Sequence, residues 1–521
     1  MVSIEPATGH AEEFGKGVQL RVRDVADQMG PEPSVRRPQR SIDVEHRASL
    51  ADVTTAAADR LVNDLRAVLP EGTVITDPEL LRSYEHDEAD FCDAGAPAAV
   101  VRPRRTEEVV ATVRVAAQHG APVVPQGART GLAGAANAVP GSIVLSTLAM
   151  DRVLRIDPVD RIAVVQPGVV TAAISRAAAE HGLRYPPDPG SWESSTIGGN
   201  VATNAGGMCC VKYGVTSEHV LGLEVVLANG DVVRCGRQTR KGVAGYDLTR
   251  LFVGSEGTLG IITEITLALR PRTEDGLTLA SLFDTIAEAG AAVSAISASG
   301  QSPSLLELLD GVHLQAIEKL RPMGLPTSAS ALLLAAADSG TRAAADIDAM
   351  AELCRSAGAT EVFVATDPVE ADQLLSARRM AHPAMEAFAQ SAFRSGAGGL
   401  IIDDVAVPVS RLTELLTGVS RIATEQELTI GVVGHAGDGN MHPNLVVDRA
   451  DPQSMARGRR AFDEIMALGL ALGGTCTGEH GVGLLKRDWL ARELGPAGLR
   501  VHQAIKHALD PQGILNPGKV L

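Results

Sequence analysis

Two short segments near the end of the chain combine histidines, a carboxylate and turn-forming glycines. The first runs from His435 to His442 (His-Ala-Gly-Asp-Gly-Asn-Met-His), and the second from Gly478 to Gly483 (Gly-Glu-His-Gly-Val-Gly). Imidazole nitrogens and carboxylate oxygens are good ligands for zinc and manganese. The two histidines of the first segment and Glu479 of the second therefore form a candidate metal-binding set that leaves one coordination position open.

The pattern around the first segment predicts a β-hairpin. Residues 429–434 (Thr-Ile-Gly-Val-Val-Gly) are typical of a strand, Asp438-Gly439 is a strong turn signal, and the run that starts at Asn444 (Asn-Leu-Val-Val) is typical of the returning strand. Side chains seven positions apart on one straight strand face opposite sides of it. A turn between the two histidines lets both imidazoles reach one ion.

His480 directly follows Glu479 in the second segment. Neighbouring side chains of an extended loop point in opposite directions, so we expect His480 to miss the metal and remain free as a base. The alternative is a glycine-rich hairpin with two surface histidines and an unrelated acidic loop. Either segment alone leaves that alternative open, whereas the presence of both favours the metal site.

The composition excludes several classes of protein. The chain has 521 residues, enough for two or three domains, and its 45% hydrophobic and 21% charged residues are typical of a globular protein. A formal net charge of −16 makes nucleic acid a poor partner. No apolar run reaches the roughly 18 residues that span a bilayer, and the N-terminus has no hydrophobic secretory signal.

The cysteines show neither metal-binding nor disulfide spacing, so we expect reduced thiols and a cytoplasmic protein, with peripheral contact to a membrane left open. These cysteines are Cys92, Cys209, Cys210, Cys235, Cys354 and Cys476.

The predicted elements mix helices and strands without the regular alternation of a doubly wound sheet, so the expected fold class is α+β. The predicted strands are 99–103, 122–125, 142–146, 161–166, 220–227, 232–235, 260–269, 331–334 and 361–364. The predicted helices are 51–69, 106–119 (capped by Thr106), 283–299, 341–356, 369–389 and 499–509.

A polar stretch at 270–276 breaks this pattern and predicts a domain boundary. We expect a flexible extension, a first domain, a second domain that carries the metal segments, and a C-terminal helix and tail that return to the first domain. Their ranges are 1–50, 51–275, 276–498 and 499–521.

The first domain contains two glycine-rich stretches but no Gly-x-Gly-x-x-Gly fingerprint, so a Rossmann-type nucleotide site has no support. One stretch is 125–134 (Pro-Gln-Gly-Ala-Arg-Thr-Gly-Leu-Ala-Gly), and the other is 194–207, preceded by Pro-Pro-Asp-Pro-Gly at 186–190. Glycine lets backbone amides approach an anion, and serine, threonine and asparagine side chains can bind phosphate and sugar. Together the stretches indicate a large nucleotide cofactor.

These stretches, together with 254–263 (Gly-Ser-Glu-Gly-Thr-Leu-Gly-Ile-Ile-Thr), resemble the flavin-binding domain of the vanillyl-alcohol oxidase/p-cresol methylhydroxylase superfamily. The two metal segments and 512–518 (Gln-Gly-Ile-Leu-Asn-Pro-Gly) narrow the resemblance to the FAD-linked D-2-hydroxyacid dehydrogenases. That family includes cytochrome-type D-lactate dehydrogenases, glycolate oxidase flavin subunits and D-2-hydroxyglutarate dehydrogenases. The resemblance implies a two-part FAD-binding domain and an α+β cap domain that binds the substrate.

The resemblance also implies FAD, with its pyrophosphate at 127–131 and its isoalloxazine near 187–203. The first stretch has no histidine of the kind used for covalent attachment, so we expect non-covalent FAD, and Arg129 can add a phosphate contact. The cofactor-binding residues expected on this basis are Gln126, Gly127, Ala128, Arg129, Thr130, Gly131, Pro187, Asp188, Ser195, Thr196, Gly198, Gly199, Asn200, Ala202, Thr203, Asn204, Gly206, Gly207, Gly260, Ile262 and Asn516.

The implied reaction is oxidation of a small D-2-hydroxy acid, D-lactate or glycolate, to the 2-oxo acid, with hydride transfer from C2 to flavin N5. His435, His442 and Glu479 would hold a zinc or manganese ion that lowers the pKa of the substrate hydroxyl. His480 would take the proton as a catalytic base.

Arg378 matches the family's carboxylate clamp, for which a guanidinium fork is suited, and Asn444 is a weaker candidate for substrate contact. The chain lacks cysteine spacing for iron–sulfur clusters and lacks a haem motif. Electrons are therefore expected to leave to a separate acceptor, and oxygen, a quinone, a cytochrome and an electron-transferring flavoprotein all remain open. We also expect a homodimer.

Other functions remain open. A metallohydrolase would use the metal set but leaves the glycine stretches unexplained. An ether-lipid synthase uses the same flavin fold for a non-redox exchange. A non-enzymatic flavin-binding subunit would lack the metal ligands that this chain has.

The expected size of the substrate depends on the residue at position 402. Relatives that act on D-2-hydroxyglutarate are expected to carry a lysine just before the segment that matches Asp403-Asp404-Val405, where this chain has Ile402. A distal carboxylate without a cation partner costs several kcal/mol in a dry site, which favours a small or apolar group at C2. The alternative is D-2-hydroxyglutarate as substrate, with Ile402 a core strand residue and Arg379 reaching the distal carboxylate.

Overall fold

The strand that enters the first glycine stretch, β3 (Val123–Gln126), lies at one edge of a four-stranded sheet. It runs parallel to β4 (Ile143–Ser146), which runs parallel to β2 (Ala99–Val101), and β1 (Val74–Ile75) pairs antiparallel with β2. The computed structural model describes residues 44–521 except 90, 240, 274–275 and 366, with side chains from residue 56 onward. Residues 56–521 form one compact unit.

Three helices accompany this sheet in the chain: α1 (Val44–Val68), α2 (Pro78–Arg82) and α3 (Thr106–His119). Residues 1–43 of the predicted extension 1–50 lie outside the described residues. Helix α1 starts at Val44, whereas the predicted helix starts at residue 51.

The second sheet has five antiparallel strands, and the second glycine stretch comes before its strand β8 (Val220–Val226) in the chain. Its order is β5 (Val153–Asp157), β6 (Ile162–Val165), β10 (Ile261–Ala268), β8 and β9 (Val232–Gly236). Two short strands, β7 (Leu183–Arg184) and β11 (Arg270–Pro271), pair with each other and form a separate sheet. The accompanying helices are α4 (Thr171–Ala179), α5 (Ile197–Thr203), α6 (Cys210–Tyr213) and α7 (Leu248–Phe252).

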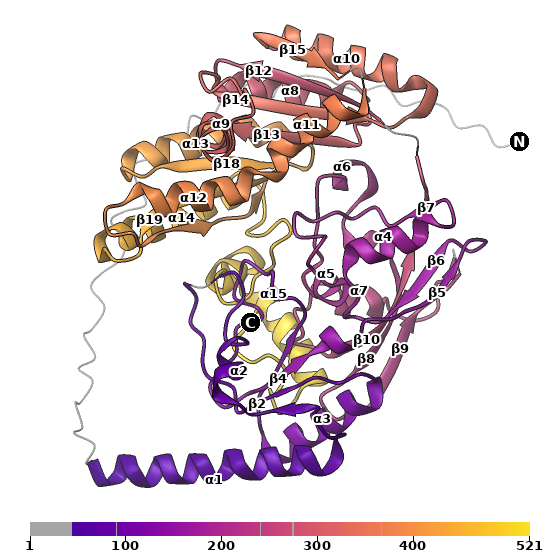
Figure 1. Ribbon diagram of the computed structural model, residues 1–521, viewed down its shortest axis with the longest axis vertical. Coiled ribbons are helices and arrows are strands. Elements are labelled where there is room, and N and C mark those ends of the chain that lie inside the picture. The colour runs from indigo at the N-terminus through magenta and orange to yellow at the C-terminus, as the bar shows by residue number, and fades with distance from the viewer. Residues whose placement is uncertain (1–43, 90, 240, 274–275, 366) are drawn as a thin grey trace, which may run out of the picture. The chain divides into compact units, whose positions relative to one another are not determined.

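The third sheet contains eight strands and carries the predicted hairpin near the end opposite β15 (Figure 1). Its order is β15 (Glu361–Val364), β12 (Leu277–Phe283), β14 (Ala331–Ala337), β13 (Leu305–Asp310), β18 (Ile430–His435), β19 (Asn440–Asp448) and β16 (Gly398–Ile402), with β17 (Val405–Ala406) also paired to β19. The turn of the hairpin uses Gly439 with a φ of 70°, and a Cβ there would lie 2.1 Å from the carbonyl oxygen of Val407. Glycine is needed at this turn for both reasons.

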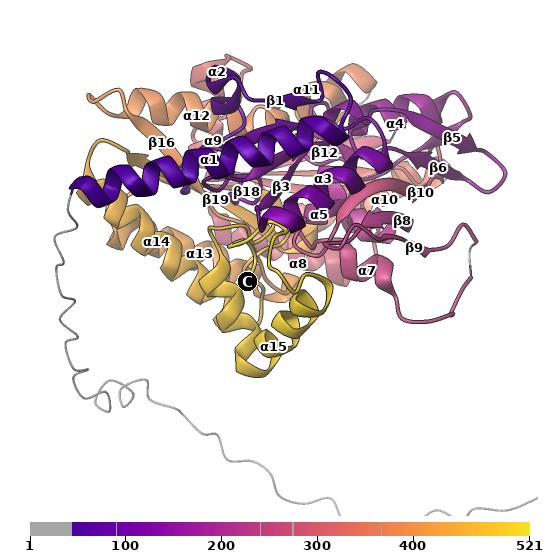
Figure 2. The same ribbon diagram turned by 90° about the horizontal axis from the view of Figure 1, so that it is seen from below.

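Helices cover both faces of this sheet, as Figures 1 and 2 show. One face packs on α8 (Ile286–Ala298), α10 (Ala343–Ser356), α13 (Leu412–Glu425) and α14 (Pro452–Ala471), and the other on α9 (Gly311–Leu320), α11 (Pro368–Arg379) and α12 (Ala381–Ala392). Strand side chains alternate between the faces, so Leu306 and Leu308 pack on the first group and Leu305 and Leu309 on the second.

Three more predicted helices differ from the structure. The helix predicted at 499–509 starts earlier, at Arg487, and the other two differ as follows. α3 starts at Thr106 with Arg105 in the cap position, so the prediction that Thr106 caps it is wrong. The Thr106 hydroxyl instead donates to the buried carboxylate of Glu224. The helix predicted at 369–389 is divided after Arg379, because Pro383 has no N–H for the carbonyl four residues earlier and its ring clashes with that carbonyl.

The last helix, α15 (Arg487–Leu509), bends at Gly495, and the tail beyond it returns to the first sheet. The backbone N–H of Val123 donates to the carbonyl of Ile514, and the N–H of Asn516 donates to the carbonyl of Val123. Ile514 and Leu515 are thereby buried in the core of that sheet. In the part of the chain that the structure describes, no helix has the length and hydropathy needed to cross a bilayer.

Leu515→Ala is expected to lower the free energy of unfolding by about 2–5 kcal/mol, because it leaves a cavity in the core of the first sheet. Leu515 is 0% exposed, whereas Val501 on α15 is 59% exposed, so Val501→Ala serves as the matched control. Guanidinium unfolding followed by circular dichroism measures both variants. Equal midpoints for Leu515→Ala and the control would contradict the packing of the tail.

Candidate active site

A cavity of about 1200 Å³ lies where the two glycine stretches meet the β18–β19 hairpin. It is larger than the pockets of roughly 300–1000 Å³ that hold drug-sized ligands, so it can take a dinucleotide-sized group together with a small substrate. The predicted site residues that line it are Gln126, Gly127, Ala128, Arg129, Thr130, Gly131, Asp188, Ser195, Thr196, Gly198, Gly199, Asn200, Ala202, Thr203, Gly260, Ile262, Arg378, His435, His442, Asn444, Glu479 and His480.

Two predicted glycines lie behind the lining and allow its parts to approach each other. A Cβ on Gly206 would lie 2.3 Å from Oε2 of Glu479, so the second glycine stretch contacts the metal segment only because this residue has no side chain. Gly207 has a φ of 149°, and a Cβ there would lie 2.5 Å from the carbonyl carbon of Asp188. Both positions therefore support the lining from behind.

The other predicted cofactor residues outside the lining are Pro187, Asn204 and Asn516. Asn204 accepts a hydrogen bond from the backbone N–H of Ser217. The Asn516 amide donates to the backbone carbonyls of Ala135 and Glu256, at 3.0 and 2.7 Å. The two asparagines hold the backbone around the cavity.

The glycine stretches fit a bound nucleotide. A Cβ on Gly127 would lie 2.3 Å from the hydroxyl oxygen of Thr196, so the backbone of the first stretch lies against the second. The buried hydroxyl of Ser195, which lines the cavity, has no hydrogen-bond partner within the described chain. An unpaired buried polar group costs about 1–3 kcal/mol, and a polar ligand in the cavity would satisfy it.

Arg129 adds a positive charge to the first stretch. Its φ of 62° lies in the left-handed region, which costs a non-glycine residue about 1–2 kcal/mol. Its guanidinium lies 4.7 Å from the centre of the Tyr84 ring. A guanidinium held beside the cavity suits the phosphates of a nucleotide.

The hairpin brings the predicted metal ligands together. Val433 pairs with His442 and His435 pairs with Asn440, so the two histidines lie diagonally on one face of the sheet. Oε1 of Glu479 lies 2.9 Å from Nε2 of His435 and 3.1 Å from Nε2 of His442. The three ligand atoms lie within 4.8 Å of one another, as a His2Glu metal site requires.

Charge reinforces this arrangement. Burial opposes ionisation of Glu479, but the adjacent His435 and His442 hold its pKa well below its usual range. Burial likewise opposes protonation of His435, yet Glu307 and Glu479 raise its pKa well above 6.5. Without a metal ion the set therefore holds an ionised carboxylate beside the imidazolium of His435. A zinc or manganese ion would displace the Nε2 proton and use the nitrogen and oxygen donors that these metals prefer.

The carboxylate of Asp404 holds the loop that carries Glu479. Its Oδ2 accepts hydrogen bonds from the backbone N–H groups of residues 478–480, at 2.9 to 3.1 Å, and from the hydroxyl of Thr477, at 2.7 Å. The ammonium of Lys486 lies 3.3 Å from the same oxygen. Burial opposes the ionisation of Asp404, but Lys486 lowers its pKa below the usual range.

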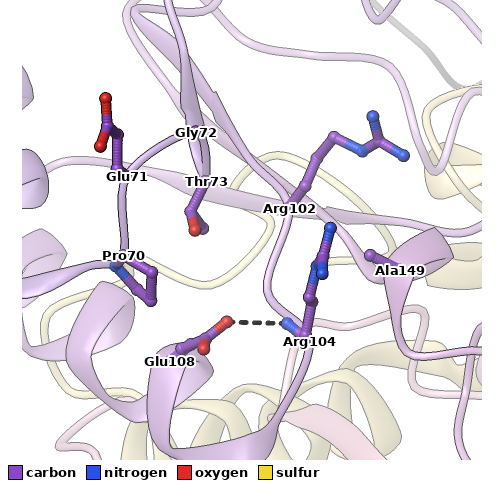
Figure 3. Close-up of a pocket in the computed structure, with 8 residues that line it drawn as sticks. All are labelled: Pro70, Glu71, Gly72, Thr73, Arg102, Arg104, Glu108 and Ala149. Atoms are coloured by element: carbon purple, nitrogen blue, oxygen red, sulfur yellow. Dashed lines mark hydrogen bonds between the residues drawn. The ribbon is translucent and has the colours of Figure 1, made fainter.

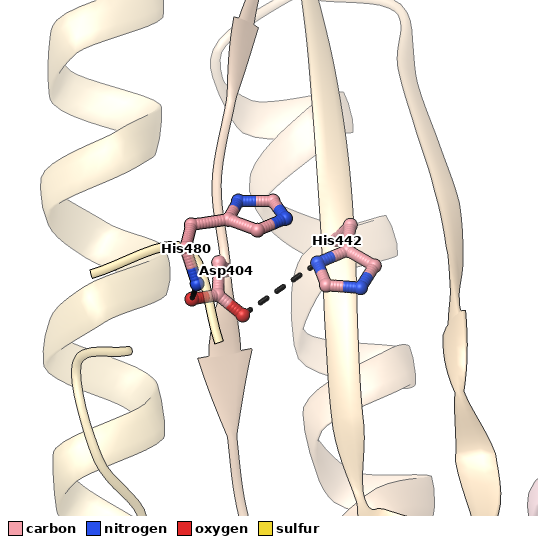
Figure 4. A group of neighbouring side chains, drawn as sticks. All are labelled: Asp404, His442 and His480. Carbon is pink, nitrogen blue, oxygen red and sulfur yellow. Dashed lines mark hydrogen bonds and ion pairs between the residues drawn. The ribbon is translucent and has the colours of Figure 1, made fainter. Parts of the chain in front are cut away.

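His480 stacks on His442, with ring centres 4.6 Å apart and planes 9° from parallel, and both lie beside Asp404 (Figure 4). Asp404, His442 and His480 also have ligand-type atoms within 4.8 Å of one another. The ammonium of Lys486 beside Asp404 disfavours a second cation there. Burial lowers the pKa of His480 to about 3, so the ring is neutral near pH 7.

Arg378 lines the same cavity from the end of α11, and its Nε lies 2.6 Å from Oε2 of Glu307. Asn444 also lines the cavity, and its amide donates to the carbonyl of His442. Arg379 lines it too, but its guanidinium bonds to Asp372 at 2.6 Å.

Sequence reasoning missed Glu307, the structural role of Asp404, and Lys486. Glu307 could have been found from the sequence, because it is a single carboxylate inside the apolar run Leu-Leu-Glu-Leu-Leu at 305–309. Ile402 lines the cavity, and residues 400–408 around it contain no cationic side chain. Lys486 approaches that run from elsewhere in the chain and bonds to Asp404.

A smaller hollow of about 300 Å³ shares no lining residue with the large cavity (Figure 3). It contains Arg102 and Arg104, both exposed, and the carboxylate of Glu108 accepts a hydrogen bond from the backbone N–H of Arg104. It holds none of the predicted ligands or glycine stretches, so the large cavity is the candidate active site.

Comparisons with known proteins agree with this geometry. Residues 97–236 match the FAD binding domain family, and residues 273–520 match the C-terminal domain of FAD linked oxidases. Among solved structures, p-cresol methylhydroxylase with substrate bound has a TM-score of 0.72 at 20% identity, with 89% of this chain and 97% of that chain covered. The 4-ethylphenol oxidase of Gulosibacter chungangensis has a TM-score of 0.71 at 21% identity and the same coverage. The predicted α+β fold of this superfamily is confirmed.

Relatives found by sequence have a higher sequence identity to this chain than these solved structures do. The glycolate oxidase subunit GlcD of Bacillus subtilis is 43% identical over 425 residues, covering 81% of this chain and 89% of that protein. A D-lactate dehydrogenase of Anaerostipes hadrus is 34% identical over 471 residues, covering 88% of this chain and 97% of that protein. The resemblance inferred from the motifs is therefore confirmed. The chain is an FAD-dependent oxidoreductase and belongs to the family of FAD-linked oxidases that includes these glycolate oxidase subunits and D-lactate dehydrogenases.

Proposed function

We propose that this protein oxidises a small D-2-hydroxy acid, such as D-lactate or glycolate, to the 2-oxo acid. The observation that carries the proposal is the single cavity lined by both glycine stretches, by the His435–His442–Glu479 set and by Arg378. A hydride donor and its acceptor must be in contact, and one cavity can hold both. The names of the glycolate oxidase and D-lactate dehydrogenase relatives support the same substrate class.

Each group around the cavity has a role in this proposal. Non-covalent FAD, held by the two glycine stretches, supplies the acceptor of the hydride from C2. His435, His442 and Glu479 would hold a zinc or manganese ion, which supplies a Lewis acid for the substrate hydroxyl. The neutral ring of His480 accepts the hydroxyl proton.

Two further side chains bind the substrate. The terminal nitrogens of Arg378 bind the C1 carboxylate as a fork, and Asn444 adds a polar contact from β19. Ile402 beside them provides an apolar wall and no charge, which favours a small or apolar group at C2. Electrons then leave to a separate carrier.

Acid or heat precipitation of the purified protein is expected to leave its flavin in the supernatant. The reason is that the first glycine stretch has no histidine for covalent attachment, and cofactor binding depends on non-covalent contacts. Absorbance of the supernatant and identification of FAD by chromatography measure this. Flavin that stays with the precipitated polypeptide would contradict non-covalent binding.

His442→Ala is expected to lose the metal and turnover together, because it removes one of three ligands. His480→Ala is expected to keep metal and FAD while flavin reduction by substrate slows by about 10²–10⁴-fold, the usual contribution of a general base. Metal analysis and stopped-flow spectroscopy measure the two effects. His502→Ala, at an exposed position on α15, is the control. A normal rate of flavin reduction in His480→Ala would remove His480 from the mechanism.

The ratio kcat/KM is expected to be higher for D-lactate or glycolate than for D-2-hydroxyglutarate, because a distal carboxylate would face Ile402, which offers it no positive charge. Ile402→Lys is expected to narrow that difference. Steady-state dye reduction with each acid, and with the L-enantiomers, gives the comparison. A clear preference of the unaltered protein for D-2-hydroxyglutarate would show that the substrate assignment is wrong.

A further inference from the structure

We propose that Glu307 is a positioning residue that orients a metal ligand and the substrate clamp at the same time, an inference that rests on the proposed function. Glu307 lies on β13 and is 0% exposed. Its Oε1 lies 2.7 Å from Nδ1 of His435, and its Oε2 lies 2.6 Å from Nε of Arg378. One carboxylate thus connects two groups with different tasks.

The location of Glu307 follows from strand pairing. Leu308 pairs with Gly434 and Leu309 with Val433, so Glu307 falls opposite His435 on the same face of the sheet. Its strand is otherwise apolar over 305–309. Burial of a lone carboxylate among leucines costs several kcal/mol, and here each oxygen has one partner that offsets this cost.

The contact with His435 determines which ring nitrogen carries the proton. An ionised carboxylate can only accept hydrogen bonds, so the proton lies on Nδ1 and points to Glu307. Nε2, the atom that lies beside Glu479, is then the nitrogen that would exchange its proton for a metal ion. A carboxylate partner of this kind orients the ring and makes it a stronger ligand.

The contact with Arg378 fixes the direction of the guanidinium. A guanidinium has five N–H donors, and Nε uses one of them on Glu307. Within the described part of the chain, the guanidinium of Arg378 makes no other hydrogen bond or ion pair. Its terminal nitrogens therefore remain available to a substrate carboxylate in the cavity.

Glu307→Gln tests the inference because glutamine keeps the shape but has one acceptor and one donor. If its amide nitrogen faces His435, the ring proton must lie on Nε2, where it competes with the metal ion. If its oxygen faces His435, the amide nitrogen opposes the N–H of Arg378. Calorimetric titration of metal-free protein with Zn²⁺ and Mn²⁺ is expected to show a Kd about 10–100-fold higher than for the unaltered protein. The KM for the 2-hydroxy acid at saturating metal is expected to rise as well.

Glu224→Gln is the matched control. Glu224 is a second buried glutamate that bonds to Arg234, Thr106 and Thr263 in a different sheet. Its loss should lower stability and leave the metal Kd unchanged. Equal metal Kd values for Glu307→Gln and Glu224→Gln would show that Glu307 is only a structural ion pair and would overturn the inference.

Glu307→Asp keeps both acceptor oxygens but withdraws them by one methylene group. It is expected to fold and to bind metal more weakly than the unaltered protein. If Glu307→Gln does not fold, the metal Kd of Glu307→Asp decides, and an unchanged value overturns the inference. If the unaltered protein binds neither metal, the proposed function itself fails, which is a separate result.

Discussion

The buried carboxylate of Asp404 is the constraint on which the candidate active site depends. One of its oxygens accepts the backbone N–H groups of residues 478–480 and bonds to Lys486. Successive amides that converge on one anion fix the path of a loop, because separating them would leave a buried charge without partners. With the loop held in this way, Glu479 reaches Nε2 of His442 and the ring of His480 stacks on the ring of His442.

Other buried charges of the site are also paired with a charge of opposite sign. Lys486 neutralises Asp404, two imidazoles flank Glu479, and Arg378 and His435 share Glu307. Interactions among buried charges are strong because the interior screens them little, and each depends on its partner being present. Each of these side chains is therefore held by a partner of opposite charge, and removing one member leaves the next without its partner.

Close approach between distant parts of the chain completes the cavity. Gly206 in the second glycine stretch leaves space for the carboxylate of Glu479, and Gly127 in the first stretch leaves space for Thr196. A methyl group at Gly206 would separate the nucleotide-binding side from the metal-binding side, and one at Gly127 would separate the two glycine stretches. For a redox enzyme of this family, that contact is what lets substrate and flavin meet.

Sequence alone determined the features that depend on neighbouring residues. The hairpin with its turn at Gly439, the glycine stretches and most helices and strands follow from local periodicity, turn chemistry and residue type. Tertiary structure alone decided the pairing of Glu307 with His435, which lie 128 positions apart, and the contact of Lys486 with Asp404. It also decided the low pKa of His480, which burial lowers to about 3. Strand register and burial arise only when distant segments pack together, and no local pattern encodes which carboxylate will face which cation.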